Sequence, residues 1–137
     1  MNTMAMGNPT FPLLARILIG ALFLTAGVRK AMTIAATAGY FAKLGLPGGE
    51  AMAWLAVIVE VGGGLLLIIG WQTRWVAWLL AIFVAVATGL AHRFWEFSDP
   101  GQYNNQLNSF LKNIAVIGGL LMFITHGPGS ASVDRGR

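Results

Sequence analysis

Residues 54–70, WLAVIVEVGGGLLLIIG, are apolar except for one acid, Glu60, which is closely followed by the glycine run 62–64. A run of about 20 such residues can cross the hydrocarbon core of a bilayer as an α-helix. An ionised carboxylate near the middle of a membrane helix costs about 2.5–3.5 kcal/mol on insertion scales, so it normally has partners within the protein. This stretch therefore predicts a membrane helix whose acid faces other helices.

The composition of the whole chain also places it in a membrane. Of its 137 residues, 56% are apolar and only 10% are charged, whereas a soluble domain carries about 25% charged residues. This length allows about four spans with short connections, so we predict one domain over residues 1–137. The net charge of +4 comes from scattered cations and not from a basic stripe, which argues against a nucleic-acid partner. Because the chain has no cysteine, its own residues cannot exchange disulfides or hold an iron–sulfur cluster.

Four apolar segments predict an all-α fold, an integral membrane four-helix bundle with antiparallel, up-down connectivity. Residues 1–12 are expected to form a short leader. The apolar run after this leader is predicted to be a membrane span that is retained, and not a cleaved signal peptide. A short interfacial helix is expected at 35–44, and the polar segment 93–109 should cap the end of the bundle. The predicted spans are 13–30, 51–69, 75–92 and 110–125.

Small residues mark the faces on which these helices should pack. Gly20 and Gly27 share one face of the first span with Lys30, and Gly63 and the next glycine share a face of the second span with Glu60. Glycine on a membrane helix lets a neighbouring backbone approach closely. Lys30 can therefore point toward the bundle, or it can extend to the lipid headgroups, and the spacing leaves both open.

Antiparallel connectivity gathers polar residues at one end of the bundle. Glu60 lies about nine residues, or roughly 13 Å, into the second span from that end. The candidate site residues there are Glu60, Lys30, His92, Lys112, Asn113 and Arg29. Such a cluster is either a packing ion pair or a site that binds a ligand or exchanges protons.

The other end of the bundle offers Arg16, Arg74 and His126 near its rim. Because His92 and His126 cap opposite ends, they cannot both ligate one haem iron, and no metal site is predicted. If the cations of the candidate site are discounted, arginines mark the side of the two termini. The positive-inside rule then places both termini in the cytoplasm and the candidate site toward the outside. The arginines on the terminal side are Arg16, Arg74, Arg135 and Arg137.

Several short pieces of the sequence form a familiar order. They are RILIG at 16–20 with Gly27 and Lys30, LGLP at 44–47, Glu60 with glycines 62–63 and LLLIIG at 65–70, Thr73, Arg74, His92, FLKNIA at 110–115, glycines 118–119, GPGS at 127–130 and Asp134. In this order and spacing the chain resembles the DoxX family of small four-span bacterial membrane proteins, over almost its whole length. The resemblance implies a four-helix bundle in the inner membrane of a bacterium.

The resemblance implies less about activity, because members of the family are linked to quinone-coupled oxidation, thiosulfate oxidation, quinone detoxification and oxidative-stress complexes. The DoxX subunit of thiosulfate:quinone oxidoreductase works with a partner subunit. No catalytic residue carries over, although five residues match the family pattern as positions. These are Lys30, Glu60, His92, Lys112 and Asn113.

Three functions remain open from the sequence. The first is an accessory or subunit in quinone-linked redox or oxidative-stress metabolism, at most an oxidoreductase subunit acting with a membrane or soluble redox partner. A quinone is the one candidate cofactor, with its headgroup at Lys30, Glu60, His92 and Lys112. The second is a structural or assembly subunit of a membrane complex, and the third is a small proton-coupled transporter. The lipid bilayer is the expected environment, and a homo-oligomer is left open.

Overall fold

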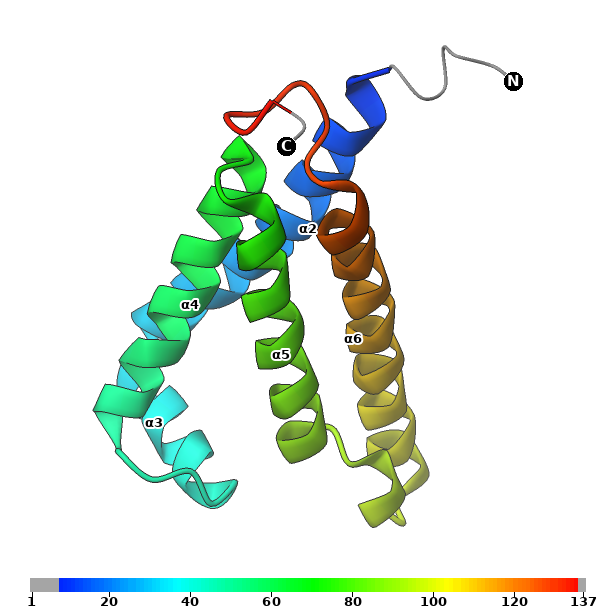
Figure 1. The fold of residues 1–137 in the computed structure, drawn as a ribbon. Coiled ribbons are helices and arrows are strands. Elements are labelled where there is room, and N and C mark those ends of the chain that lie inside the picture. The colour runs from blue at the N-terminus through cyan, green and yellow to red at the C-terminus, as the bar shows by residue number, and fades with distance from the viewer. Residues whose placement is uncertain (1–7, 136–137) are drawn as a thin grey trace.

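The computed structural model describes residues 8–135, and four long helices dominate it (Figure 1). With the labels of Figure 1, they are α2 (Thr10–Met32), α4 (Glu50–Ile69), α5 (Thr73–Ala91) and α6 (Pro100–His126). Each is long and apolar enough to cross a bilayer. Consecutive long helices run in opposite directions (Figure 1). The structure thus confirms an all-α membrane helical bundle.

Two short helices connect the long ones. The short helix expected at 35–44 is present as α3 (Ile34–Lys43), and the 3-10 helix η1 (Phe94–Glu96) follows α5. The expected leader is shorter than predicted, because α2 already begins at Thr10. Pro12 fits into the first turn of α2, where a backbone N–H has no helical partner. Residues 1–7 of the expected leader lie outside the described residues.

The last long helix begins earlier than the predicted span. α6 starts at Pro100, and the Asp99 carboxylate accepts a hydrogen bond from the backbone N–H of Gln102 at 3.0 Å. An Asp cap followed by Pro is a strong helix start. We predicted a span from residue 110 because the preceding residues are polar. The helix of 27 residues is about 40 Å long, so its polar first turns extend beyond a hydrocarbon core of about 30 Å.

The helices form two pairs, of which α2 with α4 is the tightest. A Cβ atom at Gly64 would lie 2.8 Å from the carbonyl oxygen of Gly20, and one at Gly27 would lie 3.0 Å from the Cβ of Glu60. Only glycine allows the two backbones to approach so closely. The predicted packing face is confirmed. The second pair is α5 with α6.

A hydrophobic core shared by all four long helices lies toward the end of the molecule that holds both termini, which we call the terminal half. The helices converge there and diverge toward the opposite end (Figure 1). We call the opposite end the polar half, because it holds Lys30 in the last turn of α2, its partner Glu60, and His92 directly after α5. The core residues are Phe23, Leu67, Val76, Ala77, Leu80, Ala81, Val84, Leu120 and Phe123.

Arg16 is buried inside the terminal half. Its side chain is 0% exposed, and Nη1 donates hydrogen bonds to the carbonyl oxygens of Ile68 at 2.7 Å and Leu67 at 3.5 Å. Its Nη2 donates to the carbonyl oxygen of Ala131. These acceptors include the last carbonyls of α4, which have no partner within that helix. The expectation that Arg16 lies near the rim of the bundle was therefore wrong.

Residues 127–134, which we call the strap, fold back over the turn between α4 and α5. Two backbone N–H groups of the strap donate to carbonyl oxygens at the C-terminal end of α4. Val133 donates to Ile69 at 3.0 Å, and Asp134 donates to Gly70 at 2.9 Å. The Asp134 carboxylate accepts from the backbone N–H groups of Gln72 at 2.9 Å and Thr73 at 2.8 Å. Asp134 thus caps the start of α5 from a distant part of the chain.

The burial of Arg16 also changes which charges count toward the predicted orientation of the protein in the membrane. A guanidinium that binds carbonyl groups within the fold is not a flanking charge of the kind that sets orientation. Arg74 likewise donates hydrogen bonds to the carbonyl oxygens of Ile124 at 2.8 Å and Thr125 at 2.7 Å. Arg135 remains on the terminal side, and Arg137 lies outside the described residues. The cytoplasmic placement of the two termini stays a prediction.

Candidate functional site

Lys30 and Glu60 form an ion pair between α2 and α4. The Nζ atom of Lys30 lies 2.9 Å from Oε1 and 3.1 Å from Oε2 of Glu60. Glu60 is only 4% exposed, whereas the Lys30 side chain retains 29% of its exposure. Gly27 brings the backbone of α2 against the Cβ of Glu60, so the ammonium one turn further on reaches the carboxylate. Of the two orientations left open for Lys30, the inward one is therefore present.

Lys30 is also one of the residues that line a small recess on α2. This recess has a volume of about 280 Å³ and is lined by Ala26, Arg29, Lys30 and Thr33. Two of the three ammonium N–H donors of Lys30 are directed at Glu60, and the described residues provide no partner for the third. The exposed Arg29 adds a second cation. The recess can therefore offer donors to an acceptor atom that enters from the membrane.

Two of the remaining candidates, His92 and Asn113, lie on the seam between α5 and α6. His92 Nδ1 is hydrogen-bonded to Oε1 of Gln106 at 2.8 Å. Asn113 Nδ2 donates to Thr88 Oγ1 at 2.9 Å, and Thr88 in turn donates to the carbonyl oxygen of Val84 at 2.6 Å. Lys112 is exposed and has no hydrogen-bond or ion-pair partner among residues 8–135.

The structure thus divides the predicted cluster in two, and neither His92 nor Lys112 contacts Glu60. The cause lies in the glycine contacts, which hold α2 against α4. α2 touches α6 only slightly, around Ile19 and Gly119, and does not pack on α5. Antiparallel connectivity places all four polar ends on one side, but it does not decide which helices are neighbours there.

Sequence reasoning missed Gln106, the partner of His92. The signal was present, because an Asp99 cap with Pro100 predicts a helix in which Gln106 and Asn113, seven residues apart, share a face. Asp134 was missed as well, since a cap supplied from a distant segment has no local pattern.

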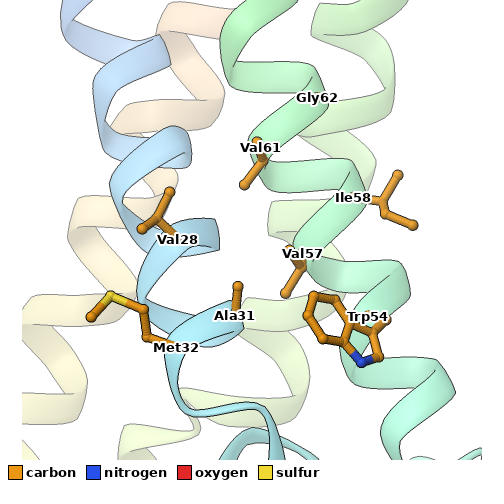
Figure 2. Close-up of a pocket in the computed structure, with 8 residues that line it drawn as sticks. All are labelled: Val28, Ala31, Met32, Trp54, Val57, Ile58, Val61 and Gly62. Atoms are coloured by element: carbon orange, nitrogen blue, oxygen red, sulfur yellow. The ribbon is translucent and has the colours of Figure 1, made fainter.

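A separate apolar groove lies on the other flank of the α2–α4 pair (Figure 2). Its volume is about 610 Å³, within the range of ligand pockets. Figure 2 shows Val28 and Ala31 of α2 facing Val57 and Val61 of α4, with the Trp54 ring at one end. Neither Lys30 nor Glu60 lines this groove. It can hold an acyl or isoprenoid chain, but only the indole N–H of Trp54 could recognise a polar headgroup.

The two members of the ion pair should differ in their contribution to stability. Lys30→Met leaves a buried carboxylate without a counter-ion, and we expect a loss of about 3 kcal/mol in the free energy of unfolding. Glu60→Gln should cost less than half of that, because the partly exposed lysine can extend toward the headgroups. Denaturation in mixed micelles measures both losses, with Lys43→Met, at an exposed lysine of α3, as the control. Equal losses from the two variants would contradict this asymmetry.

Comparisons with known proteins agree with this architecture of a small multi-pass membrane protein. The chain belongs to the DoxX family, whose model matches residues 11–93. It is similar to the inner membrane protein YphA of Escherichia coli K12, with 32% identity over 128 residues that cover 93% of this chain and 91% of YphA. It is also similar to the inner membrane protein YqjF of the same organism, with 38% identity over 123 residues that cover 90% of this chain and 88% of YqjF.

A more distant relative is the Surfeit locus protein 4 homolog of Schizosaccharomyces pombe, with 27% identity over 90 residues, or 63% of this chain and 30% of that protein. No solved structure gives a significant match. The family match includes Lys30 and Glu60 and ends at Arg93, before α6 begins. The chain is thus a multi-pass protein of the bacterial inner membrane.

Proposed function

We propose that the Lys30–Glu60 pair binds the headgroup of a membrane-soluble quinone, and that the protein is an accessory or subunit in quinone-linked redox or oxidative-stress metabolism. The observation that carries this proposal is the geometry of the ammonium group. Lys30 is held by both oxygens of a buried carboxylate, it lines the recess, and the described residues give its third N–H donor no partner. A quinone carbonyl oxygen is an acceptor that reaches such a donor from the bilayer.

The chemistry of a quinone suits an ammonium–carboxylate pair. Reduction to the quinol adds two electrons and two protons, and negative charge develops on the carbonyl oxygens. A hydrogen bond from Lys30 stabilises that charge, and the same group can pass a proton to the oxygen. Glu60 holds the ammonium in place and provides a second proton-exchanging group. Neither side chain supplies electrons, so the proposal requires an electron donor in a partner protein.

Direct binding tests this proposal. Purified protein in lipid nanodiscs is titrated with short-chain ubiquinone and menaquinone analogues. We expect saturable binding by the wild-type protein and a loss of about tenfold or more in affinity, or about 1.4 kcal/mol, in Lys30→Gln and Glu60→Gln. Glu96→Gln is the matched control, because Glu96 forms an exposed ion pair with Arg93 at 3.1 Å. Binding that is absent in the wild type, or equal in all four proteins, would overturn the proposal.

A structural or assembly subunit is the second candidate, and the position of the ion pair favours it. The pair lies one turn from Gly27 in the tightest helix contact, where it can fix the register of α2 on α4. In that case Glu60→Gln lowers the thermal stability in detergent, whereas the cellular phenotype at matched expression is unchanged. Quinone binding would then be absent from the wild-type protein as well.

A further inference from the structure

Polar contacts in the polar half stay within each helix pair. The Lys30–Glu60 ion pair joins α2 to α4, and the Asn113–Thr88 hydrogen bond joins α6 to α5. The His92–Gln106 hydrogen bond also stays within α5 and α6. For the part of the chain that the structure describes, no hydrogen bond or ion pair in this half links one pair to the other.

The terminal half, in contrast, ties the two pairs together. The strap continues from α6, accepts a hydrogen bond from Arg16 of α2, and bonds to the end of α4 and the start of α5. The shared core adds apolar contacts among all four helices in the same half. α4 meets α5 closely where a Cβ at Gly63 would lie 2.7 Å from a methyl carbon of Leu80. Figure 1 shows the helices converging at this end and diverging at the other.

From this distribution of contacts we infer that the two helix pairs are rigid bodies hinged at the terminal half, and that the polar half opens and closes between them. Separating apolar helix faces in a bilayer breaks no hydrogen bond and has no hydrophobic cost, because lipid chains are as apolar as the side chains they replace. Opening the terminal half instead breaks the strap hydrogen bonds, each of which contributes stability. Motion is therefore confined to the polar half, as in other hinged domains.

Closure of the polar half brings the seam of α5 and α6 toward the ion pair. The Thr88–Asn113 and His92–Gln106 hydrogen bonds then approach Lys30 and Glu60 from the opposite side. The polar cluster expected from antiparallel connectivity belongs to this closed arrangement. The inference does not rest on quinone binding, because it follows from the distribution of contacts, and its test contains no ligand.

The absence of cysteine makes the test direct, since pairs of introduced cysteines can be spin-labelled without background. All labelled positions are exposed in the structure. Met32→Cys with Leu111→Cys reports the distance between the pairs in the polar half. Met32→Cys with Leu55→Cys reports the distance within one pair, and Leu14→Cys with Leu121→Cys reports the distance between the pairs in the terminal half.

Double electron–electron resonance on the spin-labelled proteins in nanodiscs then gives three distance distributions. We expect the distribution between the pairs in the polar half to be roughly twice as wide as the other two, or to have two maxima. Three distributions of equal, narrow width would overturn the hinge. Size-exclusion chromatography shows beforehand that each labelled protein is folded.

A strap variant provides the second measurement. Asp134→Ala removes the cap of α5 and loosens the terminal half. We expect it to broaden the Leu14–Leu121 distribution and to leave the Met32–Leu55 distribution unchanged. An unchanged Leu14–Leu121 distribution would mean that the strap does not tie the pairs together, which contradicts the inference.

Discussion

Arg16→Leu is expected to lower the free energy of unfolding by about 3 kcal/mol or more. The substitution keeps an apolar side chain in α2 but removes all the hydrogen bonds that the guanidinium makes. Three carbonyl groups, of Leu67, Ile68 and Ala131, lose a donor whose own side chain is fully buried. Denaturation in mixed micelles or the thermal midpoint in detergent measures the loss.

Two further variants separate this effect from a general loss of charge. Arg29→Leu makes the same change on the same helix at an exposed position, and we expect its stability to stay close to that of the wild type. Arg16→Lys keeps the charge but lacks the planar guanidinium, whose two terminal nitrogens bind carbonyl oxygens of α4 and of the strap at once. It should recover only part of the lost stability. If Arg16→Leu and Arg29→Leu are equally stable, the buried guanidinium does not hold the terminal half together.

The second large effect concerns the glycine run of α4. Gly64→Ala places a Cβ 2.8 Å from the carbonyl oxygen of Gly20 and 2.9 Å from the backbone nitrogen of Leu24. Backbone atoms cannot move aside unless the two helices separate, so we expect a loss of about 3 kcal/mol, at the upper end of the range for overpacking. Gly64→Val should exceed it and disrupt the α2–α4 pair.

The neighbouring glycines of the same run are the controls. A Cβ at Gly62 would meet nothing within 4 Å, so Gly62→Ala should be neutral or gain up to about 1 kcal/mol from helix propensity. Gly63→Ala would meet the flexible side chain of Leu80 at 2.7 Å and should have an intermediate effect. Stability should therefore fall from position 62 to 63 to 64. A loss at position 64 no larger than the loss at position 62 would contradict the close approach of α2 and α4.

Periodic features of the sequence predicted much of the fold. The four spans follow from apolar runs, and the α2–α4 contact follows from glycines that recur on one face. The same faces placed Lys30 and Glu60 in one candidate cluster, but the spacing left the direction of the Lys30 side chain open, and the structure shows that it forms the ion pair. Local spacing therefore determines contacts between helices whose faces are clearly marked.

Features that depend on three-dimensional placement were not predictable in this way. The helical conformation of residues 100–109 was not predicted, because the polarity of these residues was given more weight than the Asp99 cap. Arg16 looked like a rim charge, since its acceptors are backbone carbonyls that carry no sequence signal. The separation of His92 from Glu60 depends on the crossing of α2 and α4, which residue spacing along a single helix does not reveal.

The hydrogen bond between Arg16 and the strap also constrains the biogenesis of this protein. The donor and its acceptor Ala131 are 115 residues apart in the chain. Arg16 is therefore synthesised and inserted into the membrane long before the strap leaves the ribosome. During that interval, an arginine in the first membrane helix lacks one of its native acceptors. Assembly of the terminal half can be completed only after all four helices have been inserted.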